Sequence, residues 1–412
     1  MTVSMSNYTR DKNPANSLSK NSALFFISSY FLMFTTGLAV LSTGAILPEI
    51  VKEFAIGYDL AGILLSLQAI GNMAAVIISG SALDFIGGKI VLLTGSLFLV
   101  ISFAGIAYTS SAIILYFLIF ISGCGWGINN IISSIMNNVT GGSAKHLNRV
   151  HVFFAAGAFT APFFVIFSDA IGMGWRFVSG TISILSLCSV ILIIIIKIPA
   201  AQIEHKSHKE KQANKIKVSF EAFKHARYYI FLAVSFTYAA VEAIMNGWIT
   251  TYFQNTGVLT NTEAKIALSL IWISIMTGRI IISIVGDKIK KEYIILSCAF
   301  IILIFTSVLM QLSTFLSLAV CVFILGLGLS ALLPTNLANS AVVINGSSMA
   351  MGILISTGGL GATVGPLITG MAAEQLNLSA SMWVAVGFAV ILLSTAILNY
   401  LFCKKSNTVN HR

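Results

Sequence analysis

The residues best able to do chemistry in this sequence are polar side chains set inside long apolar runs. Glu242 is the clearest of them, because the residues on both sides of it are apolar. A polar side chain recurs at every fourth position around it, so on a helix these residues share one face: Tyr238, Glu242, Asn246 and Thr250. Ionisable residues deep in a membrane helix are costly and usually functional. Glu242 could hold a proton, bind a cation or accept a hydrogen bond from a hydroxyl of a solute; alternatively, it pairs with a neighbouring helix.

A second polar set recurs at helical spacing in the fourth apolar segment: Asn130, Ser133, Ser134, Asn137 and Asn138. Neutral amides and hydroxyls suit the hydroxyl groups of a polar solute, although in lipid they also join helices. Asn130 is the best placed of the set to contact a solute. Asn336 and Asn339 are its counterparts in the second half, beside Pro334, which would kink or unwind its helix.

Further side chains could complete a solute site or move a proton. Gln68 and Asn72 lie one helical turn apart in the second segment. Three tryptophans could stack on a ring of the solute or simply pack, and Trp248 is favoured for its place beside Asn246; the other two are Trp126 and Trp272. His151 titrates in a range that suits proton transfer, but a structural role is equally open.

The elements that position these residues must cross a membrane. The chain is 57% hydrophobic and 9% charged, whereas soluble domains carry about 25% charged residues. The mean hydropathy is +0.92. Because a spanning helix needs about 20 apolar residues, the sequence predicts twelve: Ala23–Leu47, Leu60–Leu83, Ile90–Tyr108, Ile113–Asn138, Asn148–Ser168, Phe177–Ile196, Tyr229–Tyr252, Ile266–Val285, Tyr293–Leu312, Leu316–Val343, Met349–Ala372 and Met382–Phe402.

The second half of the chain repeats the first. Gly123 and Gly326, each in a Gly-x-Gly, lie 203 positions apart, as do Asp84 and Asp287 in short polar turns. A duplicated six-helix unit is typical of secondary transporters, whose solute site lies between the halves near mid-membrane. We therefore expect a cavity lined by the first, fourth, seventh and tenth helices, which Asn130, Glu242 and Asn339 approach.

The positive charges follow the predicted topology. Twenty of the 24 Lys and Arg residues fall in the termini and in segments on one side, three fall on the other, and Arg279 lies within a helix. The positive-inside rule then places both termini and the linker in the cytoplasm. The net charge of +10 is thus a topology signal and not a sign of nucleic-acid binding. The five cysteines have no metal-ligand spacing, and no phosphate loop or catalytic triad is evident.

Two turns of the chain resemble the signature of the major facilitator superfamily. They run from Gly80 to Lys89, with Asp84, and from Ser283 to Lys291, with Asp287 and Lys288. Small residues let helices approach closely, and the Asp then caps the next helix and pairs with cations. The resemblance implies a latch or gate formed by Asp84, Lys89, Asp287 and Lys288. Arg279, about two turns from Asp287, is expected to gate or to form a structural ion pair.

Shorter stretches resemble the fucose permease-like sugar symporters of that superfamily. They are Tyr238–Glu242 with Asn246–Trp248, Gly278-Arg279, Gly326–Pro334 and His151–Pro162. The resemblance implies hexose import coupled to protons or sodium. Several members carry an acidic residue in the fourth helix where this chain has Asn129-Asn130, so Glu242 becomes the main coupling residue, with His151 next.

The sequence thus predicts an all-α integral membrane protein with about twelve helices in two pseudo-symmetric bundles. The expected division is 1–22 tail, 23–196 bundle, 197–228 cytoplasmic linker, 229–402 bundle and 403–412 tail. It is expected to be a monomeric secondary transporter in the cytoplasmic membrane, moving a small polar solute such as a sugar with H⁺ or Na⁺, with no enzymatic activity, cofactor or metal. Two alternatives stay open: a proton-coupled exporter of drugs or metabolites, and a transport-inactive sensor or scaffold.

Overall fold

The computed structural model describes residues 20–139, 144–196, 222–345 and 347–409. The predicted N-terminal tail and nearly all of the predicted linker lie outside these ranges. In the described part, twelve helices are long and apolar enough to cross a membrane. The all-α membrane fold expected from the sequence is therefore confirmed.

The first half contains α1 (Lys20–Ala45), α2 (Leu47–Phe54), α3 (Tyr58–Ile86), α4 (Gly88–Tyr108), α5 (Ala112–Asn129), α6 (Ile132–Val139), α7 (Ala144–Ala170) and α8 (Gly174–Ile195). The second half contains η1 (Ala222–Lys224), α10 (Ala226–Asn255), α11 (Asn261–Val285), η2 (Gly286–Lys288), α12 (Lys291–Leu309), α13 (Phe315–Ile344), α14 (Ser348–Gln375), α15 (Leu378–Ser381) and α16 (Trp383–Val409).

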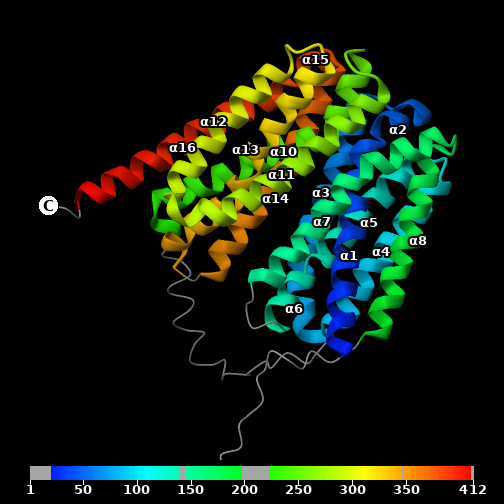
Figure 1. Ribbon diagram of the computed structural model, residues 1–412, viewed down its shortest axis with the longest axis horizontal. Coiled ribbons are helices and arrows are strands. Elements are labelled where there is room, and N and C mark those ends of the chain that lie inside the picture. The colour runs from blue at the N-terminus through cyan, green and yellow to red at the C-terminus, as the bar shows by residue number, and fades with distance from the viewer. Residues whose placement is uncertain (1–19, 140–143, 197–221, 346, 410–412) are drawn as a thin grey trace, which may run out of the picture.

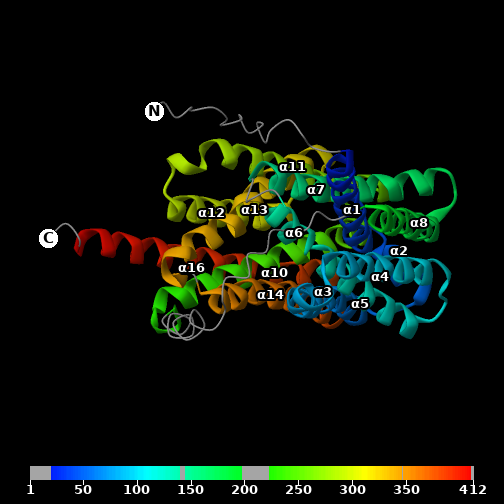
Figure 2. The same cartoon turned by 90° about the horizontal axis from the view of Figure 1, so that it is seen from below.

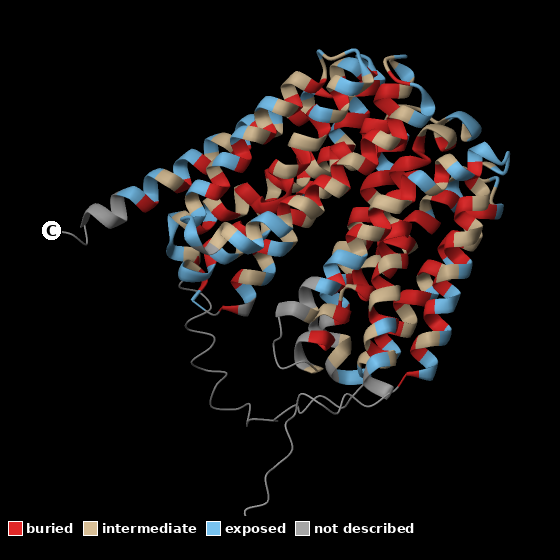
Figure 3. Ribbon diagram, in the orientation of Figure 1, coloured by how far each residue is buried: buried red, intermediate tan, exposed pale blue. Residues whose placement is uncertain are grey.

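The helix pairs of the first half recur in the second. α1 packs on α7, α3 on α5 and α4 on α8; correspondingly, α10 packs on α14, α11 on α13 and α12 on α16. Figure 1 shows the two groups of helices as separate halves, and Figure 2 shows them side by side from below. Large apolar side chains on the outer faces, such as Ile78, Phe117 and Ile184, are exposed, as expected where lipid is the solvent. Buried residues fill the inside of each half (Figure 3).

Repeat-related glycines explain the close packing of these pairs. A Cβ on Gly157 of α7 would collide with the carbonyl oxygen of Phe34 on α1, and one on Gly361 of α14 with that of Phe236 on α10. Only a residue without a side chain allows backbones to approach so closely. A glycine therefore makes the corresponding helix crossing in each half.

The two halves meet at one end of the molecule, which we call the closed end; it carries α2, α15 and the turn between α10 and α11 (top of Figure 1). Lys265 of α11 is fully buried there and contacts Glu49 of α2 at 2.7 Å and Asp169 of α7 at 2.6 Å. The Tyr58 amide at the start of α3 donates to Glu374 of α14 at 2.8 Å. These contacts join the halves through paired charges, and removing one partner of such a pair is costly.

Another ion pair at the closed end stays within the first half. Arg176 of α8 contacts Glu53 of α2 at 2.5 Å, and Trp175 also donates to this carboxylate. Burial raises the pKa of Glu53, but the hydrogen bonds from Arg176 and Trp175 outweigh it and hold the pKa below its ordinary value. This pair fastens α2 to α8.

The opposite end, where Ile196 and Ala222 flank the linker, is called the linker end. Figure 1 shows the halves diverging toward it. Lys89, at the start of α4, donates to the carbonyl oxygens of Ile194 and Ile196 at 2.7 and 2.9 Å. A cation at the last carbonyls of a helix is favoured by the helix dipole, so Lys89 caps α8.

Two local expectations from the sequence differ from the structure. The fourth predicted segment is interrupted: α5 ends at Asn129, Asn130 is its C-cap, and α6 starts at Ile132. The polar face expected from Asn130 to Asn138 is therefore not one helix face. Of the two effects expected of Pro334, a kink or unwinding of its helix, unwinding does not occur, since α13 runs unbroken from Phe315 to Ile344.

Candidate functional site

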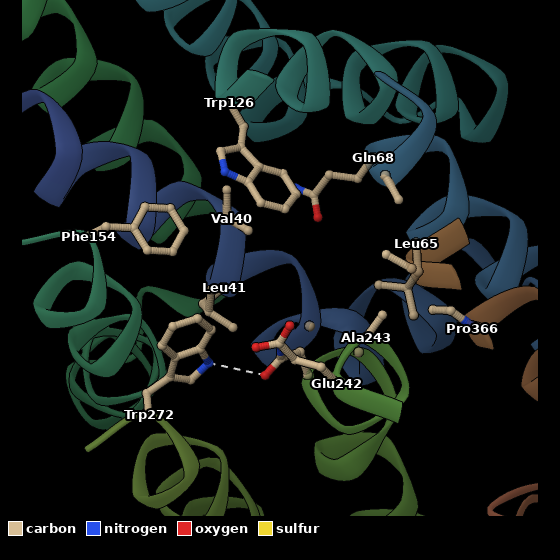
Figure 4. A pocket seen from close by; sticks show the side chains of 15 residues that line it. Val40, Leu41, Leu65, Gln68, Trp126, Phe154, Glu242, Ala243, Trp272 and Pro366 are labelled. Carbon is tan, nitrogen blue, oxygen red and sulfur yellow. Dashed lines mark hydrogen bonds between the residues drawn. The ribbon is translucent and has the colours of Figure 1, made fainter. Parts of the chain in front are cut away.

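A cavity of about 130 Å³ lies between the halves (Figure 4). Its walls come from α1, α3, α5 and α7 of the first half and from α10, α11 and α14 of the second. The expected first, fourth and seventh helices thus contribute. The expected tenth helix, α13, does not line this cavity, whereas the second, fifth, eighth and eleventh do.

Glu242 is the one ionisable residue among those that line this cavity. It lies at the middle of α10, and its carboxylate faces the cavity (Figure 4). Tyr238, one turn earlier on the same helix, is its hydrogen-bond partner. The four-residue spacing seen in the sequence therefore has a structural counterpart: Tyr238 holds the carboxylate, and Asn246, one turn further on, also lines the cavity.

Two amides line the cavity from opposite halves. Gln68 of α3 donates from Nε2 to Thr43 at 3.0 Å and to Ser122 at 3.3 Å, both in the first half. Asn246 of α10 accepts at Oδ1 from the indole nitrogen of Trp272 at 3.1 Å (dashed line in Figure 4). Each amide is thus held by its own half and keeps a second polar atom for other partners.

Aromatic rings form the apolar wall. Trp126 of α5 stacks near Phe154 of α7, with ring centroids 6.4 Å apart, and Phe154 meets Trp272 of α11 edge-on at 6.0 Å. All three line the cavity. Rings beside a few convergent polar groups are typical of a site that binds a small polar molecule with apolar faces.

Arg279 faces this site from α11. It interacts electrostatically with Glu242 on α10 and with His151 on α7 of the other half. Its Nε is buried and has no hydrogen-bond partner among the described residues. His151 is exposed and is not part of the cavity wall. Arg279 therefore interacts with one ionisable group in each half.

Three predicted amides lie away from the cavity. Asn336 is buried and donates to Ser235 and to the Phe231 carbonyl oxygen, both at 3.0 Å, so it joins α13 to α10. Asn339 accepts from Arg227 at 3.0 Å. Asn72 follows Gln68 by one turn, but it is not a lining residue, and its buried Nδ2 has no partner in the described ranges.

Two further predictions need correction for geometric reasons. Asn130 does not line the cavity, because the helix ends there and the chain turns into α6. Trp248 is fully buried, and its Nε1 donates to the Pro366 carbonyl oxygen at 3.2 Å, so it packs α10 on α14 and has no free ring face for a solute. The tryptophans that reach the cavity are Trp126 and Trp272.

Known proteins agree with this architecture. The family model described as Major Facilitator Superfamily matches residues 29–345 and 259–412. The chain belongs to the Major Facilitator Superfamily. It is 19% identical over 388 residues to the glucose/mannose transporter GlcP of Bacillus subtilis (strain 168), covering 90% of this chain and 94% of the relative.

Solved structures of superfamily transporters share the fold. The nucleoside transporter NupG matches with a TM-score of 0.74 at 16% identity, covering 93% of this chain and 99% of NupG. A D-xylose–proton symporter matches with a TM-score of 0.69 at 14% identity, covering 92% and 96%. A bacterial homologue of the lysosomal transporter Spinster, in an inward-facing and unoccupied conformation, matches with a TM-score of 0.73 at 13% identity, covering 93% and 98%. The family and these neighbours are transporters and not enzymes.

The superfamily signature turns are only partly visible. The side chains of Asp84 and Asp287 lie outside the part of the chain that the structure describes, so their predicted latch role stays a prediction. Lys89 caps α8 as described above, whereas in the second half Lys291 donates to the Ala338 carbonyl oxygen of α13 at 3.1 Å and so joins α12 to α13. Lys288 is exposed in η2.

Two groups were not anticipated from the sequence. Phe154 is an ordinary apolar residue by sequence, and nothing marks it as a cavity residue. Lys265 is one of the three cations that the positive-inside count puts on the side opposite the termini. It lies one residue before the predicted eighth helix, whereas α11 begins at Asn261 and includes it. The structure places its partners Glu49 in α2 and Asp169 near the end of α7.

Proposed function

We propose that the protein is a secondary active transporter that takes up a small neutral polar solute across the cytoplasmic membrane. A sugar is the first candidate for this solute. Transport proceeds by alternating access and is driven by a proton or sodium gradient. The observation that carries this proposal is the inter-half cavity, in which one carboxylate, two amides and three aromatic rings converge. Solutes of secondary transporters bind at this place between the repeats.

The charge balance of the site favours a neutral solute. Glu242 is the one ionisable residue among those that line the cavity, and Arg279 interacts with it from α11. A charged solute would therefore find the negative charge of Glu242 and the positive charge of Arg279 already paired with each other. The carboxylate therefore remains available for a coupling ion, while amides and rings hold the solute.

The size of the cavity and the relatives favour a sugar over a bulky drug. Pockets that enclose drug-sized ligands have volumes of about 300–1,000 Å³, larger than the 130 Å³ found here. The glucose/mannose transporter and the D-xylose–proton symporter support a monosaccharide. Nucleosides are the second candidate, because NupG shares the fold over nearly the whole chain.

The orientation of the protein follows from its charges. The linker end is assigned to the cytoplasm, because most Lys and Arg residues fall in the segments on that side. The closed end is then extracellular, and the similarity to an inward-facing transporter structure supports an inward-facing state. Single-cysteine labelling in sealed cells tests the assignment: strong labelling of the linker by an impermeant reagent contradicts it.

A binding screen tests the solute class. Thermal unfolding of the purified protein is measured with hexoses, pentoses, polyols and nucleosides, while pH and Na⁺ are varied. A ligand that binds the folded state raises the midpoint, by an amount that grows with its concentration relative to Kd. Stabilisation by a monosaccharide supports the proposal, stabilisation by nucleosides alone selects the second candidate, and stabilisation only by large apolar drugs overturns both.

A further inference from the structure

The two amides of the cavity are fixed in opposite orientations, and the chemistry of their partners decides which atom each one offers to a solute. An amide has one oxygen that accepts and one nitrogen that donates, and the two ends look alike in shape. The hydrogen-bond partners therefore have to identify them. In both amides they do so unambiguously.

Asn246 is fixed by Trp272. An indole N–H can only donate, so the Asn246 atom at 3.1 Å from it is the carbonyl oxygen. The remaining atom, Nδ2, makes no hydrogen bond with any residue in the described ranges, and Asn246 lines the cavity. Asn246 therefore offers the solute a donor.

Gln68 is fixed by Ser122. The hydroxyl of Ser122 donates to the Ile119 carbonyl oxygen at 2.7 Å, so it can only accept from Gln68, and the Gln68 atom that contacts it is the nitrogen. Nε2 also reaches Thr43. The Gln68 oxygen has no partner among the described residues and points into the cavity in Figure 4. Gln68 therefore offers an acceptor, as does the carboxylate of Glu242.

We infer that the cavity recognises a hydroxylated solute by two acceptors and one donor, and that Trp272 is a positioning residue that sets the donor by fixing the Asn246 amide. This inference rests on the proposed sugar site and adds its specificity. The solute must donate hydroxyl protons to Gln68 in one half and to Glu242 in the other, and must present an oxygen lone pair to Asn246. A solute bound in this way bridges the halves.

Sugar analogues distinguish the two kinds of contact. Replacing one hydroxyl by fluorine leaves a weak acceptor but removes the donor, whereas replacing it by hydrogen removes both. At the hydroxyl that faces Asn246, the fluoro analogue should therefore bind at least about tenfold more tightly than the deoxy analogue, since one lost hydrogen bond at a buried site corresponds to roughly this factor. At the hydroxyls that face Gln68 and Glu242, both analogues should bind poorly.

The experiment measures binding of D-glucose and of each of its single deoxy and deoxyfluoro analogues to purified protein, by ligand-induced thermal stabilisation. In Trp272→Phe the ring stays but the indole donor is lost, so Asn246 can turn its oxygen to the solute. We expect the fluoro-over-deoxy preference to shrink to less than about twofold. Trp126→Phe is the matched control, because Trp126 lines the same cavity and makes no hydrogen bond with the described residues. It should weaken all analogues by a similar factor and keep the preference.

A second variant covers the case in which Trp272→Phe does not fold. Asn246→Asp keeps an oxygen for the indole but replaces the free donor by another oxygen, and it should abolish tolerance of the fluoro analogue. Two outcomes overturn the inference while leaving the sugar site intact. In one, both variants fold and still prefer the fluoro analogue over the deoxy analogue. In the other, the unmodified protein binds D-glucose but shows no such preference. Failure of D-glucose and of every other monosaccharide to bind overturns the proposed function itself.

Discussion

Two groups interact with the carboxylate of Glu242: Tyr238 donates a hydrogen bond to it, and Arg279 supplies a compensating positive charge. A charge in a low-dielectric cavity is stable only with such partners. Protonation of Glu242, or binding of a cation beside it, would release Arg279 from this interaction. In the proposed mechanism, a coupling ion that releases Arg279 would thereby change the contact between α10 and α11.

Replacing Arg279 should show how far the Glu242 carboxylate depends on it. In Arg279→Gln the carboxylate loses its cation, and we expect lower thermal stability and lost uptake. In the double variant with Glu242→Gln, the loss of unfolding free energy should differ from the sum of the two single losses by about 0.5–3 kcal/mol, because each single change already removes the same interaction. Thermal unfolding of the four proteins measures this coupling.

Lys288→Gln provides the control, since Lys288 is exposed in η2. Its effect should add to that of Glu242→Gln within about 0.5 kcal/mol. If the Arg279 and Glu242 changes are equally additive, the two side chains do not interact energetically.

Spacing in the sequence located Glu242, Asn246 and Gln68 but could not separate them from similar residues. Asn130 satisfies the same periodicity, yet the helix stops at that residue, and periodicity carries no information on where a helix is capped. Trp248 and Trp272 are equivalent by composition; which ring is buried against α14 depends on how α10 is rotated, which only packing determines. The choice of residue therefore required the structure, whereas the choice of helix in these cases did not.

At the scale of elements, glycines at crossings hold each half together. Gly157 and Gly361 allow α7 and α14 to approach α1 and α10 so closely that a methyl group would collide with backbone oxygens. The predicted helix boundaries agree with the structure to within a few residues, except in the fourth segment and at the end of the last one, where α16 continues past Phe402 to Val409. The pairing of helices could not be read from hydropathy, because every spanning segment is apolar on most of its surface.

A single methyl group should therefore destabilise these crossings. Gly157→Ala and Gly361→Ala should each lower the free energy of unfolding by about 1–3 kcal/mol, since backbone must shift to make room. Gly387→Ala in α16 is the control: no atom lies within 4 Å of the added Cβ. There the helix propensity of alanine should leave stability unchanged or raise it by up to about 1 kcal/mol. Thermal unfolding of the three variants in detergent measures the difference, and equal losses in all three would contradict the packing argument.

At the scale of the whole molecule, charges on both halves hold the closed end together. Lys265 belongs to the second half and its partners Glu49 and Asp169 to the first, so the alternate state of an alternating-access cycle must separate them. Nothing in the sequence indicates that Lys265 meets these two carboxylates, because the three residues lie far apart along the chain.

Loss of Lys265 should shift the protein toward opening at this end. In Lys265→Met the two carboxylates lose their partner, and we expect a cysteine introduced at Ala69 in the cavity wall to react several-fold faster with an impermeant thiol reagent added outside cells. All native cysteines are replaced for this measurement. Arg176→Gln is the matched control, because its ion pair with Glu53 lies at the same end but within one half. Equal acceleration in both variants, or none in Lys265→Met, would show that the triad does not hold the halves together.

The central claim is that uptake against a gradient depends on Glu242, the carboxylate of the inter-half cavity. Glu242→Gln keeps the size of the side chain and most of its hydrogen bonding but removes its charge. Cells or vesicles carrying this variant are compared with wild type for accumulation of the identified solute and for exchange of labelled solute without a gradient. The control is Glu53→Gln, which changes a carboxylate outside the cavity and should leave both accumulation and exchange unchanged. The account predicts that Glu242→Gln abolishes accumulation and largely retains exchange. Accumulation by Glu242→Gln at the wild-type level would contradict it.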